Sequence, residues 1–227
     1  MDIYGSDLHI ESPWSNKEAQ HRFLDLVEQE KPDRVVLIGD TFEALVDVKV
    51  TLASEITIRL KDIANRTEVF CLPGNFPHDE WEFLRTLTAD VQPIRVVEAI
   101  PSVPPGNLLT HGAEFDPTIR FWEHFRWAYR LLPGLVRAFI KPSPSSLRNK
   151  GKIDELVRLA GRIHQAAQRH AIDNNYPVVF CGHTHLRQRL DVEPSHKGTV
   201  EVLGSLGQGP YLCALCEHDK YEIRQVC

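Results

Sequence analysis

Residues able to bind a metal ion follow short apolar runs at five places along the sequence. They combine carboxylates, an amide and imidazoles: Asp7, His9, Asp40, Asn75, His111, His183 and His185. Such a mixture of oxygen and nitrogen ligands suits first-row divalent ions, whereas calcium favours oxygen alone. Seven ligands exceed what one such ion takes, so they indicate two ions about 3.5 to 4 Å apart that share a bridging carboxylate. Such a pair clamps a phosphoryl oxygen and activates water, which predicts phosphoester hydrolysis.

Each ligand group follows a run of residues typical of a buried strand. The predicted strands span residues 3–4, 34–38, 68–72, 107–110 and 177–181. Amphipathic patterns predict helices over 17–30, about 51–64 and about 153–173. In open α/β sheets the loops at the carboxyl ends of the strands meet at one edge, so we expect one shared site. Four later runs predict antiparallel strands and hairpins: 187–192, 199–203, 211–216 and 221–226.

The alternative interpretation of each of these polar residues, taken alone, is structural. An Asp or a His after a strand is more often a turn or capping residue than a metal ligand. Seven such residues after five predicted strands make coincidence a poor explanation. We therefore expect a dimetal site.

The size and composition predict one soluble globular domain, residues 1–227. The 227 residues are 42% hydrophobic and 25% charged, which excludes a disordered, collagen-like or multi-span membrane chain. The formal net charge is −5, but residues 117–170 contain eleven Lys or Arg against three Asp or Glu, a net +8. This basic stretch falls in a predicted helical insertion at about 117–174. The remaining acidic scaffold disfavours long nucleic acid as a partner.

The cysteines and the N-terminus indicate a reducing compartment. Five scattered cysteines, an odd number, do not suggest a disulfide framework. Cys213 and Cys216 form a C-x-x-C pair in a predicted strand, where residues three apart point to opposite faces, so we expect no shared zinc ion. The N-terminus has no signal-peptide pattern. We expect a cytoplasmic protein, with peripheral contact to the inner face of the membrane through the aromatic and basic residues 120–140.

Five short sequences resemble, in order, the five signature blocks of the calcineurin-like metallophosphoesterases. They are Asp7-Leu8-His9, Gly39-Asp40, Gly74-Asn75, His111-Gly112 and Gly182-His183-Thr184-His185. The resemblance implies an α/β fold, a two-sheet αββα sandwich with a helical lid before the last block. It implies one metal ion bound by Asp7, His9, Asp40 and His185, and another bound by Asp40, Asn75, His111 and His183. It also implies catalytic roles, with Asp40 bridging the ions while Asn75 and His111 position the phosphoryl group.

The third block departs from the family pattern. The family has a His after Gly-Asn that protonates the leaving group or stabilises the transition state, whereas Phe76 follows Asn75 here. His78 lies two residues further on. Either His78 acts as the general acid, or the leaving group departs without one, as that of a phosphoanhydride does. The structural alternative is that His78 is an exposed loop residue.

Within the family, the sequence is most similar to the UDP-2,3-diacylglucosamine hydrolases of lipid A biosynthesis. Residues 39–44, Gly-Asp-Thr-Phe-Glu-Ala, resemble their second block, and those enzymes also carry a helical insertion and lack the third-block His. The likeness implies that Arg120, Arg126 and Arg130 of the insertion bind an amphiphilic phosphorylated substrate. The acidic stretch usual after their second block and their third-block Arg are absent, which leaves the substrate open. The alternative for the insertion is a core helix hairpin with solvated arginines.

The sequence thus predicts a metal-dependent hydrolase of phosphate or diphosphate esters, in which a metal-bound hydroxide attacks phosphorus. Manganese ranks first as the metal, with iron, zinc or cobalt as alternatives. The expected substrate is a phosphorylated small molecule or a lipid-linked compound, including one with a UDP-2,3-diacylglucosamine-like pyrophosphate bond. Two alternatives stay open. One is a phosphodiesterase, nuclease or phosphomonoesterase of the same superfamily, and the other is a metal-binding scaffold without activity.

Overall fold

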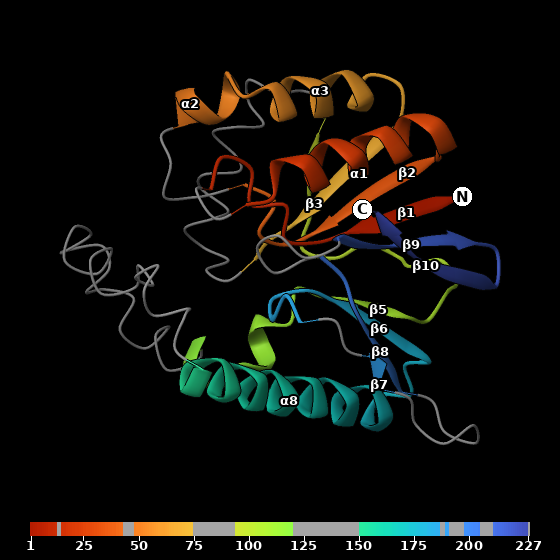
Figure 1. Cartoon of the computed structure of the whole chain (residues 1–227). Helices are drawn as coiled ribbons and strands as arrows, with labels where there is room; N and C mark the ends of the chain where they lie inside the picture. Colours follow the sequence, from red (N-terminus) through yellow and green to blue (C-terminus); the bar gives the residue numbers. More distant parts are fainter. Residues whose placement is uncertain are drawn as a thin grey trace.

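Two β-sheets lie face to face, with helices on their outer faces (Figure 1). The computed structural model describes residues 1–12, 15–42, 48–74, 94–119, 150–186, 189–190, 198–204 and 211–226. Helices α1 (Lys17–Glu30) and α3 (Glu55–Ala64) cover one sheet, and α8 (Lys150–Asp173) covers the other. This arrangement confirms the predicted α/β fold with a two-sheet αββα sandwich.

The larger sheet has the strand order β10-β9-β1-β2-β3-β4. Its three central strands are parallel neighbours: β1 (Asp2–Gly5), β2 (Arg34–Ile38) and β3 (Glu68–Leu72). The outer strands are β4 (Arg95–Val96), β9 (Tyr211–Glu217) and β10 (Lys220–Val226). The C-terminal strands form the predicted antiparallel hairpin, and β9 also pairs antiparallel with β1.

The smaller sheet has the order β5-β6-β8-β7. Its strands are β5 (Leu108–Leu109), β6 (Val178–Cys181), β7 (Arg189–Leu190) and β8 (Thr199–Val202). The predicted antiparallel arrangement holds for β7 and β8, but β8 is parallel to β6. The backbone amides of Gly198 and Thr199 donate to the carbonyl of Pro177, so β8 starts beside the start of β6 and must run in the same direction.

The central strands are buried on both faces, which is why they read as continuous apolar runs. In β2, Val35 and Leu37 face the core under α1 and α3, whereas Val36 and Ile38 face the smaller sheet and share a core with Phe180. The same alternation separates the two cysteines of β9, because Cys213 lies in the helix-facing core and Cys216 in the core between the sheets. The expectation that they face opposite ways is confirmed.

The helices begin and end at recognisable signals. Asn16 caps α1 by accepting the backbone amide of Ala19, and Lys31 ends it in a left-handed conformation. The single helix predicted over about 51–64 is instead two, α2 (Val48–Leu52) and α3, because Ser54 takes the extended conformation of an N-cap between them. No helix in the described ranges combines the length and apolar character of a membrane span.

Candidate metal centre

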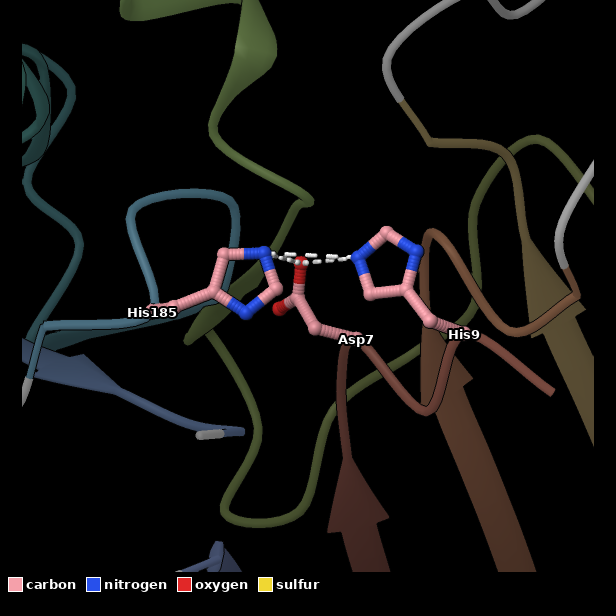
Figure 2. A group of neighbouring side chains, drawn as sticks. All are labelled: Asp7, His9 and His185. Atoms are coloured by element: carbon pink, nitrogen blue, oxygen red, sulfur yellow. Dashed lines mark hydrogen bonds and ion pairs between the residues drawn. The ribbon is translucent and has the colours of Figure 1, made fainter. Parts of the chain in front are cut away.

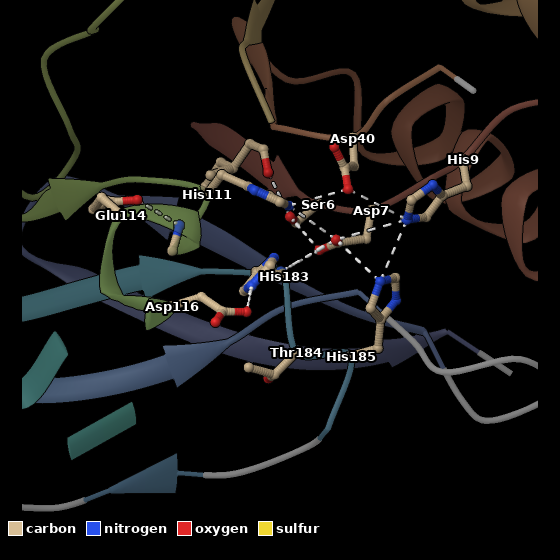
Figure 3. A network of polar contacts seen from close by, with 12 residues as sticks. Ser6, Asp7, His9, Asp40, His111, Glu114, Asp116, His183, Thr184 and His185 are labelled. Atoms are coloured by element: carbon tan, nitrogen blue, oxygen red, sulfur yellow. Dashed lines mark hydrogen bonds and ion pairs between the residues drawn. The ribbon is translucent and has the colours of Figure 1, made fainter. Parts of the chain in front are cut away.

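The candidate ligands sit at equivalent places after their strands. Six of them are among the described residues: Asp7, His9, Asp40, His111, His183 and His185. The first ligand always lies two residues after the end of its strand, and a second follows two residues later in the loops after β1 and β6. The four strands belong to both sheets. The loops of two sheets (Figure 3), rather than the one sheet edge expected from the sequence, therefore build the site.

Asp7, His9 and His185 form one group of converging ligand atoms (Figure 2). The Nε2 atoms of the two imidazoles lie 3.3 Å apart. Asp7 Oδ1 lies 3.4 Å from His185 Nε2 and 3.9 Å from His9 Nε2. The two rings stack with their centroids 5.1 Å apart, and the Asp7 carboxylate points between them.

Asp7, Asp40 and His111 form a second group, and all three are buried. His111 Nε2 lies 3.1 Å from Asp7 Oδ1 and 3.6 Å from Asp40 Oδ2. Asp40 Oδ2 is also 3.7 Å from His9 Nε2, which connects this group to the first. Asp7 is the residue that belongs to both groups, so the bridging role assigned to Asp40 by resemblance stays a prediction.

The spacing of these atoms fits a pair of divalent ions. Ligand atoms about 2.0 to 2.1 Å from one tetrahedral ion are about 3.3 to 3.4 Å from each other. The separations given above between these imidazole nitrogens and carboxylate oxygens run from 3.1 to 3.9 Å, which brackets that value. Imidazole nitrogens combined with carboxylate oxygens suit first-row metals. The chain therefore carries a candidate dimetal site.

Asp7 is held by several donors besides the imidazoles. The hydroxyl of Ser6 donates to Oδ2 at 2.6 Å, and the backbone amide of His183 donates to both carboxylate oxygens at 3.1 and 3.0 Å. Burial alone would raise the pKa of Asp7, but the neighbouring imidazoles, with His185 and His111 foremost, lower it below the usual range. The carboxylate is therefore ionised at neutral pH and ready to bind a cation.

His183 lies beside these groups but belongs to neither. Its ring contacts that of His111 edge to face, with the centroids 5.2 Å apart, and its Nε2 donates to Asp116 Oδ2 at 2.9 Å. Its assignment to the second ion stays a prediction. Five other candidates lie outside the described residues and also stay predictions: Asn75, His78, Arg120, Arg126 and Arg130.

The sequence profile of the calcineurin-like phosphoesterases matches residues 6–187, which include all the ligands just described. The chain belongs to this family. Calcineurin-like phosphoesterases are phosphoester hydrolases, and the name covers no single substrate. Comparison with curated protein sequences gives no match.

Solved structures give distant likenesses to this family member. It is similar to an archaeal phosphodiesterase, with 13% identity, a TM-score of 0.45 and coverage of 99% of this chain and 98% of that one. It is similar to YfcE, a phosphoesterase from E. coli, with 15% identity, a TM-score of 0.45 and coverage of 100% of this chain and 99% of that one. It is also similar to Vps29 from Entamoeba histolytica, with 14% identity, a TM-score of 0.44 and coverage of 99% of this chain and 98% of that one. These likenesses carry no argument about the activity.

Four polar residues around the ligands of this phosphoesterase did not emerge from the sequence: Ser6, Asp116, His164 and Thr184. Ser6 and Thr184 are direct neighbours of ligands, and their hydroxyls contact Asp7 and His164 respectively. Adjacency to a ligand was a signal that could have drawn attention to them. Asp116 and His164 are separated from their partners by 67 and 20 residues, so only the fold brings them to the site.

Proposed function

We propose that this chain is a hydrolase that uses two divalent metal ions, preferentially manganese, to cleave a phosphate or diphosphate ester. The observation that carries the proposal is the position of Asp7 in two adjoining ligand groups. One carboxylate common to both groups can hold two cations close together. Two such ions polarise a phosphoryl oxygen and lower the pKa of water.

The protein contributes buried, negatively charged ligands whose positions are set by hydrogen bonds and by the fold. Asp7 and Asp40 supply negative charge in a buried setting, where it attracts cations strongly because water screens it poorly. Ser6 and the amide of His183 fix the orientation of Asp7. His9 and His185 come from opposite sheets, so the sandwich itself sets the distance between their rings.

We infer further that the substrate is amphiphilic and of the UDP-2,3-diacylglucosamine kind. The support is the sequence: the likeness of residues 39–44 to that subgroup and the basic stretch between the fourth and fifth ligand blocks. Arg120, Arg126 and Arg130 would bind its phosphates, and the aromatic residues of 120–140 would cover its apolar part or touch a membrane surface. An acidic scaffold with one basic insertion suits such a ligand better than long nucleic acid.

The decisive experiment combines elemental analysis with parallel hydrolysis assays. The purified chain is loaded with Mn²⁺ and incubated with a phosphodiester, a phosphomonoester and UDP-2,3-diacylglucosamine. Two bound ions and hydrolysis of the diphosphate substrate are expected. Preference for the phosphodiester or the monoester would replace the substrate proposal with that class. Two bound ions without hydrolysis of any substrate would support a metal-binding scaffold instead.

A deletion tests the role of the insertion separately. A variant without residues 120–140 is expected to cleave a short water-soluble substrate normally and the acylated substrate poorly. Equal cleavage of both substrates would remove the insertion from substrate binding. The thermal unfolding temperature of the variant serves as the control, because a misfolded chain would lose both activities.

A further inference from the structure

The turn Gly182–His185, here called the ligand turn, is held by two side chains that are not themselves in a ligand group. Asp116 follows the short helix η1 (Ala113–Phe115), and His164 lies in α8. We propose that Asp116 and His164 are positioning residues for this turn: Asp116 leaves Nδ1 of His183 as the nitrogen that binds metal, and His164 fixes Thr184 between the two histidines. The inference rests on the proposed function, because it assumes a metal at this site.

Asp116 holds the Nε2 edge of the His183 ring by a hydrogen bond. It is 6% exposed, and its Oδ2 accepts His183 Nε2–H at 2.9 Å. Its other oxygen accepts the backbone amide of Thr118 at 2.7 Å, and its own amide donates to the carbonyl of Ala113. Figure 3 shows the contact between Asp116 and the His183 ring. Because both carboxylate oxygens are engaged, the carboxylate has little freedom to turn away from the ring.

This contact decides which nitrogen of His183 is free to bind a cation. Asp116 Oδ1 already accepts the backbone amide of Thr118, and Oδ2 faces Nε2 of the His183 ring, so the carboxylate is placed as an acceptor for the Nε2–H. A neutral imidazole whose Nε2 carries the proton has its lone pair on Nδ1. His183 Nδ1 is buried and has no hydrogen-bond partner in the part of the chain that the structure describes. Metal-binding histidines in proteins usually donate their other N–H to a carboxylate, a backbone carbonyl or water.

His164 connects the same turn to the helix behind it. The imidazole is 0% exposed, and its Nε2 lies 2.7 Å from the hydroxyl of Thr184. Helix α8 is fixed on the smaller sheet by Ala167 and Ala171, which pack in one core with the strand residues. Removing one partner of such a buried pair leaves the other polar group without its hydrogen bond, which is unfavourable away from water. His164 therefore ties the position of the ligand turn to that of α8.

The two contacts act from different elements on adjacent residues. Asp116 comes from the loop that also follows the ligand His111, and His164 comes from the helix that precedes β6. Two elements of the segment between the fourth and fifth ligand blocks thus contact the ligand turn. The role of this segment in the protein includes the support of the ligand turn as well as the proposed contact with substrate.

The experiment measures Mn²⁺ binding to the metal-free full chain by calorimetry. Asp116→Asn keeps the shape of the side chain and is expected to weaken binding of one ion by about 10- to 100-fold. His164→Leu is expected to weaken binding of both ions, since His183 and His185 belong to different predicted sites. His164→Gln can still form a hydrogen bond with Thr184, so its Mn²⁺ affinity is expected to be close to that of the wild-type chain. Asp173→Asn, an exposed substitution at the end of α8, is the matched control.

A second readout separates positioning from general loss of structure. NMR spectra of the imidazole nitrogens report which nitrogen of His183 carries the proton, and Asp116→Asn is expected to shift that balance in a chain with unchanged unfolding temperature. Unchanged Mn²⁺ affinity together with an unchanged tautomer would overturn the role of Asp116. Unchanged affinity in His164→Leu would overturn that of His164. If the wild-type chain binds no Mn²⁺, the proposed function fails, and the tautomer still decides whether Asp116 orients the ring.

Discussion

Five of the six described candidate ligands share a strained backbone conformation. Among the described residues, nine other than glycine have a positive φ, and five of them are proposed ligands: Asp7, His9, Asp40, His183 and His185. Each such conformation costs about 1 to 2 kcal/mol in an ordinary residue. Backbone hydrogen bonds between the loops, such as the amide of Asp7 to the carbonyl of Gly39 and that of His9 to Asp40, hold these residues in place. Strain concentrated on ligands is typical of a site that is shaped before its ligand arrives.

Removal of Asp40 tests the ligand set at the residue scale. Asp40→Ala deletes a buried carboxylate that lies near both His9 and His111, so we expect turnover to fall to background and metal content to drop. Elemental analysis and Mn²⁺-supported hydrolysis measure the two effects. Asp219→Ala, in the exposed turn between β9 and β10, is the control. A variant of Asp40 with full metal content and normal turnover would contradict the assignment.

His78 is tested through its dependence on the leaving group. If His78 donates a proton, His78→Ala should slow hydrolysis of an ester with a poor leaving group by about 100-fold or more. Hydrolysis of a nitrophenyl ester should change far less, because that leaving group departs without a proton. His218→Ala, an exposed histidine in the β9–β10 turn, is the control. If the substitution changes the hydrolysis rate of neither ester, His78 has no role in catalysis.

At the scale of single elements, the sequence predicted where helices and strands begin and end better than it predicted which strands pair and in which direction. The bounds of α1, β2 and β3 match the predicted 17–30, 34–38 and 68–72, because amphipathic and apolar patterns are local. The direction of β8 was missed, since it depends on hydrogen bonds to Pro177. The residues that form the two ligand groups were all candidates from their residue types after strands: Asp7, His9, Asp40, His111 and His185. His183 stays a prediction. Asp116 and His164 were not candidates, because a buried Asp or His has no distinctive sequence context.

Gly182 shows how closely two elements approach at the site. A Cβ at this position would overlap the side chains of Ser6 and Asp7, so the loops after β1 and β6 are in contact there. Gly182→Ala is expected to displace Asp7, to weaken Mn²⁺ binding by at least about 10-fold and to lower the unfolding temperature. Gly161→Ala is the matched control. A Cβ there meets no atom within 4 Å, and an alanine inside α8 should raise stability by about 0.5 to 1 kcal/mol. Equal Mn²⁺ affinity in the two variants would refute the close approach.

At the scale of the whole molecule, the three buried layers explain why one site depends on the entire fold. The first core lies under α1 and α3, the second between the sheets and the third under α8. Ligands reach the centre from loops of both sheets, so the middle layer fixes the distance between the two halves of the site. The sequence indicated this only through the family resemblance, because apolar runs do not reveal to which sheet a strand belongs. Anything that loosens the middle layer is expected to loosen the metal centre.

Alkaline pH is predicted to loosen these layers. Burial raises the pKa of the Cys213 and Cys216 thiols to about 12, and it raises those of Cys181, Tyr4 and Tyr211 as well. In the unfolded chain a thiol ionises near pH 8.5, so above about that pH the unfolded state binds fewer protons than the folded one and stability falls as pH rises. The stabilising effect is complete below pH 8.5 and is lost progressively up to about pH 12.

Urea unfolding under reducing conditions at about pH 8 and about pH 10.5 measures this loss. The free energy of unfolding should be smaller at the higher pH, and Cys213→Ala should show a smaller difference between the two, because it removes one titrating thiol from the core beneath α1. The free energy of unfolding of each protein is compared between the two pH values, so the cost of the cavity that the alanine leaves cancels. A free energy that is equal or larger at the higher pH would mean that the buried thiols and phenols do not control the alkaline limit.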